Sequence, residues 1–391
     1  MKSLSNPLLI ISDNPGLRTG LARVARDLTS LATTMPEWRV ATLGRGEGSR
    51  QAFPWMQYSF HESGQWGENW LEEVWRDFAA GEDGIIFTLD DPSRRLWFAR
   101  EETIAQANPS LARFLGPGRN FRKWGYFPVD GTGPNGHALG QEGRAVVEGY
   151  DRVLAASEWG RDTLRRGGRV DADWLPHGIG EEWQRVGNAR ELCGWAKTDV
   201  VIGAVMANQA RKDFPVLFET AALMKAKYGN RFRLWLHTDL MIRYWNVWAL
   251  GRDYGVEDCL EVTLELEDQA LAARYSACDG TLLPSGGEGF GFPAAESLAC
   301  GTACVVPDYA AAQELVEEAH RVTPVTYRVD TMHNVRRAVL SGHGFAAALA
   351  QEIESGRDRE IRAEELQERV EHLRWRNLRH AWERWLREGL K

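Results

Sequence analysis

Short apolar runs alternate with longer amphipathic stretches along the whole chain. Nearly continuous apolar strands that alternate with helices are typical of parallel sheets covered on both faces, so the pattern predicts an α/β protein. Each half of the chain opens a new series of strands, which indicates two doubly wound, Rossmann-like domains. The predicted strands are 8–12, 38–43, 84–90, 123–130 and 152–157 in the first half, and 200–206, 231–239, 260–266, 280–285 and 303–308 in the second.

The boundary between the two series falls in the polar, glycine-bearing stretch 177–199. We therefore predict one domain over 1–180 and a second over 181–372. The remaining segment, 373–391, is predicted as an amphipathic helix. Packing of its apolar stripe onto the protein's own domains is favoured over a helix that lies on a membrane surface. The stripe consists of Leu378, Trp382, Trp385 and Leu386.

Composition narrows the function classes. The net charge of −8 argues against the protein as a whole being an electrostatic surface for nucleic acid, although a local basic groove stays open. No apolar run reaches the roughly 18 residues of a membrane span, and the N-terminal run LLII is too short for a signal peptide. Five scattered cysteines make no disulfide framework, so we expect a cytoplasmic protein. We expect no metal site.

A basic loop follows the first strand of the second half. In VMANQARKDFPVLF (205–218), Arg211 and Lys212 stand just ahead of a helix that carries Pro215 in its first turn. Two adjacent cations at a helix N-terminus would neutralise a diphosphate. An exposed basic turn explains the composition equally well.

The stretch PSGGEGFGFPAAESLACGT (284–302) is the densest candidate site. A strand ends at Ser285, glycines turn the chain, and a helix follows that Gly301 stops. Glu288 would lie in the loop and Glu296 in the first turns of the helix. Carboxylates accept hydrogen bonds from sugar hydroxyls and backbone amides donate to phosphate or sugar oxygens, so this loop favours a site for a polyhydroxyl ligand. Its amides would come from Gly289, Phe290 and Gly291.

Two loops of the first half are further candidates. The turn 12–28 places Gly16 and Gly20 ahead of an amphipathic helix, where the backbone can approach an anion closely. The segment YFPVDGTGPNGH (126–137) delivers Asp130 from a buried strand into a glycine-rich loop. That placement suits a carboxylate facing a cleft, whereas a turn held by Asp130's own side chain is the competing interpretation.

Taken together, these motifs resemble glycosyltransferase family 4. Glu288 to Glu296, followed by SLACGT and a strand, is similar to the family's E-x7-E signature, and NQARKDF (208–214) resembles its donor-diphosphate loop. LPHGIG (175–180) resembles the interdomain loop, and the Gly16–Gly20 turn resembles the N-terminal glycine loop. The segment YFPVDG, together with NQARKDF and the SGGEGFGFP run, looks like a branch found in viral, archaeal and metagenomic sequences.

The resemblance implies a GT-B fold, in which two Rossmann-like domains face each other across a cleft and the last helix crosses back to the first domain. It implies a nucleotide-sugar donor, UDP-linked by expectation, retention of anomeric configuration, and neither a catalytic metal nor another cofactor. Asp90-Asp91 is then not a metal motif, and it lacks D-x-D spacing.

The resemblance also assigns roles. Arg211 and Lys212 would bind the donor diphosphate and stabilise the departing nucleotide. Glu296 would bind the ribose and Glu288 the transferred sugar. The amides of Gly289, Phe290 and Gly291 would reach sugar or phosphate oxygens, and Gly20 would line the diphosphate side of the first domain. Many members of the family carry a histidine after the fourth strand of the first domain; here Asp130 stands at that position.

The acceptor is left open by the sequence. A hydroxyl of a glycan or a lipid-linked glycan is favoured, with the enzyme cytoplasmic or peripheral at a membrane. The alternative is a hydroxymethylated DNA base in a virus-infected cell, for which the basic segments 93–100 and 120–125 and a helix with Arg161, Arg165 and Arg166 offer cations. A non-catalytic module that binds carbohydrate or nucleic acid is the alternative of another class.

Overall fold

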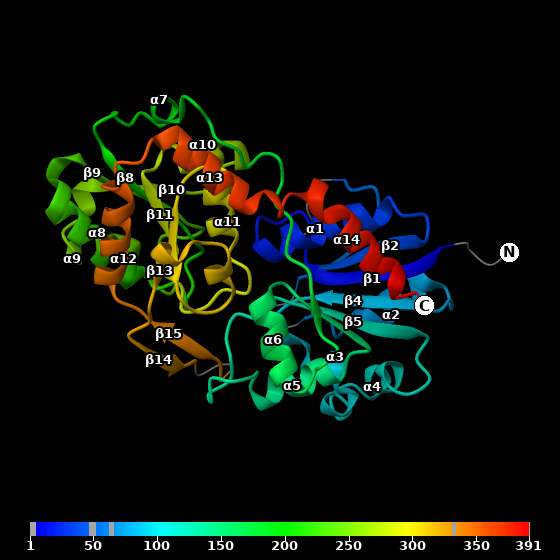
Figure 1. The fold of residues 1–391 in the computed structure, drawn as a ribbon. Coiled ribbons are helices and arrows are strands. Elements are labelled where there is room, and N and C mark those ends of the chain that lie inside the picture. The colour runs from blue at the N-terminus through cyan, green and yellow to red at the C-terminus, as the bar shows by residue number, and fades with distance from the viewer. Residues whose placement is uncertain (1–4, 47–51, 62–65, 331–333, 391) are drawn as a thin grey trace. The chain divides into compact units, whose positions relative to one another are not determined.

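A computed structural model describes residues 5–46, 52–61, 66–330 and 334–390 of the chain. The chain folds as two compact units (Figure 1). Unit 1 comprises residues 1–178, 331–335 and 378–391, and unit 2 comprises residues 179–330 and 336–377.

Unit 1 is built on a seven-stranded parallel sheet with the order β3-β2-β1-β4-β5-β6-β7. The interior strand β1 carries Leu9 and Ile11, which are fully buried in the core. Its strands are β1 (Asn6–Asp13), β2 (Trp38–Arg45), β3 (Met56–Phe60), β4 (Gly84–Leu89), β5 (Phe121–Phe127), β6 (Arg152–Ala155) and β7 (Asp173–Trp174). Its helices are α1 (Gly20–Thr33), α2 (Leu71–Ala79), α3 (Leu96–Ala99), α4 (Pro109–Leu115), α5 (Gln141–Glu148) and α6 (Glu158–Arg166).

Unit 2 has a six-stranded parallel sheet with the order β10-β9-β8-β11-β12-β13 and a separate hairpin, β14-β15. Figure 1 shows α8, α9 and α12 on one face of the sheet and α10, α11 and α13 on the other. The strands are β8 (Val200–Val205), β9 (Phe232–His237), β10 (Leu260–Thr263), β11 (Gly280–Leu282), β12 (Cys304–Pro307), β13 (Arg321–Val322), β14 (Thr326–Val329) and β15 (Arg336–Val339). The helices are α7 (Ala189–Cys193), α8 (Phe214–Tyr228), α9 (Val247–Asp253), α10 (Asp268–Ala277), α11 (Phe292–Ala299), α12 (Gly342–Ile353) and α13 (Arg359–Glu371).

The two doubly wound sheets confirm the predicted fold class, and each of the ten predicted strands coincides with a strand. The run 123–130 is shorter than predicted because β5 ends at Phe127, before Pro128, which has no N–H to donate to a neighbouring strand. The sequence pattern missed strands that lack an apolar run. Of these, β3 lies at a sheet edge and all four residues of β14 are exposed.

The last helix, α14 (Trp375–Glu388, red in Figure 1), enters unit 1 at Leu378. The residues just before it are hydrogen-bonded within unit 2 instead. The carbonyl of Leu373 accepts from the amide of Ile179, and Arg374 donates to the carbonyls of Gly180 and Trp183. The four residues of the predicted apolar stripe are all buried. Trp385 packs against Phe87 and Trp124 of the unit 1 sheet, which is the packing that the pattern favoured over a membrane surface.

The limits of the two units lie close to the predicted domain boundaries, except for one short additional segment of unit 1. The predicted boundaries were 180/181 and 372/373, and unit 1 ends at residue 178 and resumes at residue 378. Asn334 and Val335, which precede β15, also belong to unit 1. Among the described helices, none has the length and apolarity that a bilayer crossing requires.

Candidate functional site

In unit 2, the loops after β8 and β11 carry most of the predicted site residues. These two strands are neighbours, and the chain proceeds from β8 toward one edge of the sheet and from β11 toward the other. Loops that leave the carboxyl ends of such a strand pair form the crevice in which open α/β sheets bind their ligands. The sheet topology therefore places the basic loop and the glycine-rich loop at the position where a ligand site is expected.

Backbone hydrogen bonds hold the two loops together. The amide of Gly286 donates to the carbonyl of Arg211 at 2.8 Å, and the amide of Asp213 donates to the carbonyl of Pro284 at 2.8 Å. Lys212 and Ser285 form an isolated antiparallel bridge between them. Because the backbones are paired, the side chains that the loops carry are fixed relative to one another.

Glu288 joins the two cations of the basic loop. Its Oε1 accepts from Arg211 Nη1 at 2.6 Å and also from Lys212 Nζ. Lys212 is 6% exposed and Glu288 7%, whereas about a quarter of the Arg211 side chain is exposed. Burial opposes ionisation of Glu288, but the charges of Arg211 and Lys212 outweigh it and lower the pKa of the carboxyl to about 2. The cluster thus carries one net positive charge, partly open to solvent.

The glycine-rich loop ends at Gly291, which immediately precedes α11. Gly291 has φ +103°, and a Cβ there would approach the Ala312 Cβ at 3.1 Å, so glycine is required by both conformation and space. No side chain caps the N-terminus of α11. Among the described residues, no group accepts from the backbone amides of Gly289 and Gly291. These amides are suited to an anionic or hydroxyl-bearing ligand.

Glu296 belongs to a different network from Glu288. It lies in the second turn of α11, is 4% exposed, and accepts a hydrogen bond from the Tyr275 hydroxyl of α10 at 3.1 Å. Tyr275 is fully buried, and this burial raises the pKa of its hydroxyl well above the ordinary value. Tyr275 therefore stays neutral and orients the Glu296 carboxylate. The two glutamates of the predicted signature are positioned by separate contacts.

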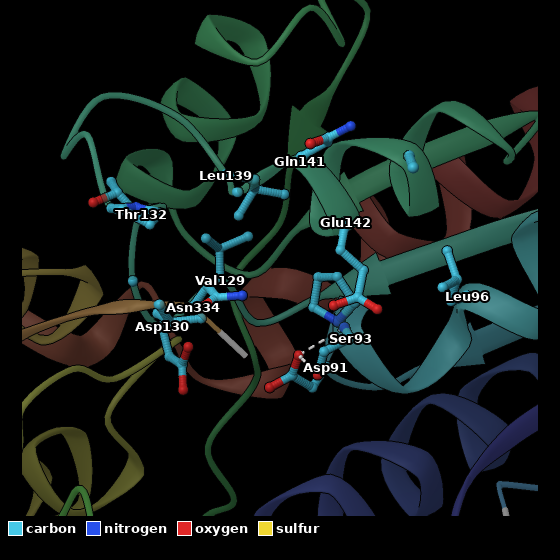
Figure 2. A pocket seen from close by; sticks show the side chains of 17 residues that line it. Asp91, Ser93, Leu96, Val129, Asp130, Thr132, Leu139, Gln141, Glu142 and Asn334 are labelled. Carbon is cyan, nitrogen blue, oxygen red and sulfur yellow. Dashed lines mark hydrogen bonds between the residues drawn. The ribbon is translucent and has the colours of Figure 1, made fainter. Parts of the chain in front are cut away.

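Unit 1 contains a second candidate site, a pocket of about 620 Å3 at the carboxyl ends of β4 and β5. Asp91 follows β4, Asp130 follows β5, and Glu142 comes from the first turn of α5. Figure 2 shows these three side chains around the pocket, with Asp91 held by Ser93. Apolar lining comes from Leu96, Val129 and Leu139, and Asn334 and Val335 also contribute.

The adjacent residues Asp90 and Asp91 have different surroundings: Asp90 is buried in ion pairs, whereas Asp91 lines the pocket. Asp90 is buried and pairs with Arg94 at 3.0 Å and Arg95 at 2.7 Å. Asp91 accepts from the amide and hydroxyl of Ser93 at 2.9 and 2.8 Å. Burial raises the pKa of the Asp91 carboxyl, and the negative charge of Asp130 raises it further. Sequence reasoning missed Asp91 because it considered the pair only as a possible metal motif and rejected it. An acidic pair directly after a buried strand was the available signal.

Gly20 is the first residue of α1, at the carboxyl end of β1 in unit 1. It is exposed, and Thr19 before it caps the helix by accepting from the Ala22 amide while donating to Asp13 at 2.6 Å. The predicted site residues thus divide between the units, with Gly20 and Asp130 in unit 1 and the others in unit 2. Within the described residues, no group of three or more His, Cys, Asp or Glu side chains could hold a metal ion.

Comparisons with known proteins concern the fold and part of unit 2. Residues 248–355, which include Glu288 and Glu296, match the family model described as glycosyl transferases group 1. No curated protein matches the chain. Sucrose-phosphate synthase from Thermosynechococcus elongatus is similar in structure over 98% of this chain and 99% of its own, with 18% identity and a TM-score of 0.73.

Two further solved structures are similar over nearly their whole length. Anabaena HepE in complex with UDP and glucose has 15% identity and a TM-score of 0.69, over 98% of this chain and 99% of its own. WaaG, a glycosyltransferase involved in lipopolysaccharide biosynthesis, has 12% identity and a TM-score of 0.64, over 96% and 98%. At these identities the likeness shows the fold, which is GT-B. The family match and the fold together support a glycosyltransferase.

Proposed function

We propose that this chain is a retaining, metal-independent hexosyltransferase of glycosyltransferase family 4 that uses a UDP-sugar. The observation that carries the proposal is the cluster of Arg211, Lys212 and Glu288 at the switch point of the unit 2 sheet. A site with one net positive charge beside unpaired loop amides is complementary to a diphosphate. The similar structure of HepE is a complex with UDP and glucose, which supports UDP as the nucleotide.

In this proposal Arg211 and Lys212 stabilise the charge that develops on the departing diphosphate. Glu288 keeps both cations in place before the donor binds, and its carboxylate also faces the transferred sugar. The backbone amides of Gly289, Phe290 and Gly291 face the same sugar. Glu296, oriented by Tyr275, accepts from the ribose. We assign Gly20 to the diphosphate side of unit 1.

The reaction breaks the bond between the anomeric carbon and the diphosphate oxygen and forms a bond from that carbon to an acceptor hydroxyl. The hydroxyl proton passes to the leaving diphosphate, and the enzyme acts mainly by holding both substrates in position. Asp130 takes the place that a histidine has in many family members, as a carboxylate beside the acceptor. We propose a glycan or lipid-linked glycan as the acceptor, and a reducing compartment because all five cysteines are free thiols.

DNA is the second candidate acceptor, and the contacts of the basic residues argue against it. Most of the cations that suggested DNA binding are engaged within unit 1, although Arg122 is exposed. Arg94 and Arg95 pair with Asp90, and Lys123 is buried. Arg161 pairs with Glu158 and Asp162, Arg165 donates to the Ala172 carbonyl, and Arg166 donates to the His137 carbonyl and to Thr163.

The test is a panel of radiolabelled nucleotide sugars incubated with the full chain, with and without acceptors that include glycans, lipid-linked glycans and hydroxymethylcytosine DNA. We expect release of UDP from one UDP-sugar and transfer of label to a glycan-type acceptor with its anomeric configuration retained. Lys212→Ala is the inactive control. Release of no nucleoside diphosphate from any donor would refute the enzyme and favour the non-catalytic binding module.

A further inference from the structure

Unit 1 has another pocket at the amino ends of β2 and β3, which we call the amino-edge pocket. Residues that line it include Trp38, Arg39, Pro54, Trp55, Met56 and Phe78. Its volume of about 500 Å3 lies within the range of about 300–1,000 Å3 that is typical of small-molecule sites. Because the strands of this sheet are parallel, Gly20 and Asp130 follow strands at the opposite edge. The amino-edge pocket is therefore separate from the residues that the proposed reaction uses.

Three N–H donors of the lining residues have no hydrogen-bond acceptor within the described part of the chain. They are Trp38 Nε1, Trp55 Nε1 and Arg39 Nε, and all three atoms are buried. The two indoles are 5% and 9% exposed. A buried donor without an acceptor costs free energy, so folded proteins normally satisfy such groups with protein, water or a ligand. Three of them on the lining of one pocket point to a ligand that is rich in acceptor atoms.

The charges at the pocket favour a neutral ligand. Among the described residues of the lining, Arg39 is the one charged side chain. Its Nη2 donates to the carbonyl of Phe78 and to Glu82, both at 3.0 Å, so a carboxylate already balances the guanidinium. An anion would have to compete with Glu82. Hydroxyl and ring oxygens of a sugar accept from N–H groups without carrying charge.

The aromatic part of the lining suits the C–H face of a sugar ring. Trp55 stacks on Phe53, with 4.7 Å between the ring centroids, and Phe78 lies under the Arg39 guanidinium. Tryptophan joins a large apolar ring to a polar N–H, and therefore fits a ligand that is apolar on its face and hydroxylated at its rim. Met56 is 52% exposed, and its flexible, unbranched side chain can move to admit an acceptor to the buried N–H groups.

We propose that the amino-edge pocket is a non-catalytic carbohydrate-binding site that holds one sugar unit of an oligosaccharide. The N–H groups of Trp38, Trp55 and Arg39 donate to its hydroxyl or ring oxygens, while the aromatic rings pack on its C–H face. Binding here does not depend on the proposed transfer reaction, because the site is at the other edge of the sheet and needs no donor.

The experiment follows the indole N–H resonances of the full chain, prepared with isotope-labelled tryptophan, while a probe is added. The probes are maltopentaose, cellopentaose, the N-acetylglucosamine pentamer and uridine. Trp38→Phe and Trp55→Phe identify the two resonances by their absence. We expect at least one oligosaccharide to shift both resonances at millimolar concentration, and uridine to shift neither. No shift with any oligosaccharide, or a shift with uridine alone, would overturn the proposal.

Variants separate the hydrogen bonds from folding. Trp55→Phe keeps an aromatic ring but removes the N–H, so we expect about threefold to tenfold weaker binding of the same oligosaccharide in a calorimetric titration. Arg39→Lys keeps the charge that pairs with Glu82, removes the Nε–H, and should act in the same direction.

Trp97→Phe is the matched control. Within the described chain, Trp97 also has a buried N–H without an acceptor, but it does not line the amino-edge pocket, so its variant should bind the oligosaccharide as the wild type does. Thermal unfolding of each variant shows whether it is folded. A loss in the control equal to that in Trp55→Phe, or wild-type affinity in both pocket variants, would contradict the assignment.

Discussion

Arg211 and Glu288 form a 2.6 Å ion pair between loops that are 77 residues apart in the chain. The pair connects the carboxyl ends of β8 and β11, where the order of the unit 2 sheet reverses. Lys212 reaches the same Glu288 oxygen, so a single carboxylate fixes both cations. In the proposed function, Arg211 and Lys212 give up part of their contact with Glu288 when they bind the donor diphosphate.

Arg211→Ala and Lys212→Ala are expected to lower turnover by roughly 10²-fold or more, because each removes a charge that stabilises the leaving diphosphate. The measurement is steady-state release of UDP from the preferred donor. Lys227→Ala removes an exposed lysine from the far end of α8, the helix that follows the basic loop, and should leave turnover unchanged. Near-normal activity of both loop variants would contradict the phosphate assignment.

Glu296→Gln is expected to weaken binding of UDP about tenfold, since it removes the charge that strengthens the hydrogen bond to the ribose. Glutamine keeps an acceptor for Tyr275, so the variant avoids leaving that buried hydroxyl unpaired. Calorimetric titration with UDP measures the effect, and Glu364→Gln, an exposed change on α13, is the control. An unaltered UDP affinity in a folded Glu296→Gln protein would disprove the ribose role.

Treatment with a chelator is expected to leave turnover intact, because the cations of Arg211 and Lys212 neutralise the diphosphate in the proposed mechanism. The rate of UDP release is compared before and after dialysis against EDTA, and again after Mg²⁺ or Mn²⁺ is added. A loss of activity that either metal restores would show that the mechanism depends on a metal ion.

His177 is expected to make unit 1 sensitive to acid. It is buried beside the Tyr126 hydroxyl, 2.8 Å away, and burial lowers the pKa of its imidazole to about 3 from an ordinary value of 6.5. The unfolded chain therefore binds a proton that the folded chain does not over this range, so stability is full above about pH 6.5 and falls as the pH drops toward 3. His177→Gln should show a flatter decline of melting temperature across that window. Parallel curves for both proteins would exclude His177 as the cause.

Trp385→Ala is expected to destabilise unit 1 by about 3–5 kcal/mol, the cost of removing a large aromatic side chain from a core. Trp385 is 5% exposed, contacts Phe87 and Trp124, and lies under the Arg152 guanidinium. Denaturant unfolding measures the loss, and Arg384→Ala, the exposed neighbour, should change stability by no more than about 0.5 kcal/mol. Unchanged stability together with lost binding to lipid vesicles would favour the membrane-surface helix instead.

The position of the two loops that we propose bind the donor was predictable from the sequence because it depends on local order. The glycines, Glu288 and the helix that begins after Gly291 follow one strand, and Arg211 and Lys212 follow another, so strand pattern and loop composition identify them. The partners of the two glutamates were not predictable. Glu296 accepts from Tyr275 on α10, a contact that depends on how two helices pack and leaves no trace in residue spacing.

The alternation of apolar strands and amphipathic helices by itself determined the two doubly wound sheets, because burial on both faces requires that pattern. The amphipathic stripe of 378–386 likewise determined that the last helix has a buried face. Which charged side chains lie next to each other was decided only by the tertiary structure. It paired Asp90 with Arg94 and Arg95 and left Asp91 beside Asp130 in a pocket, because consecutive residues after a strand point in different directions and the neighbouring elements decide what each one meets.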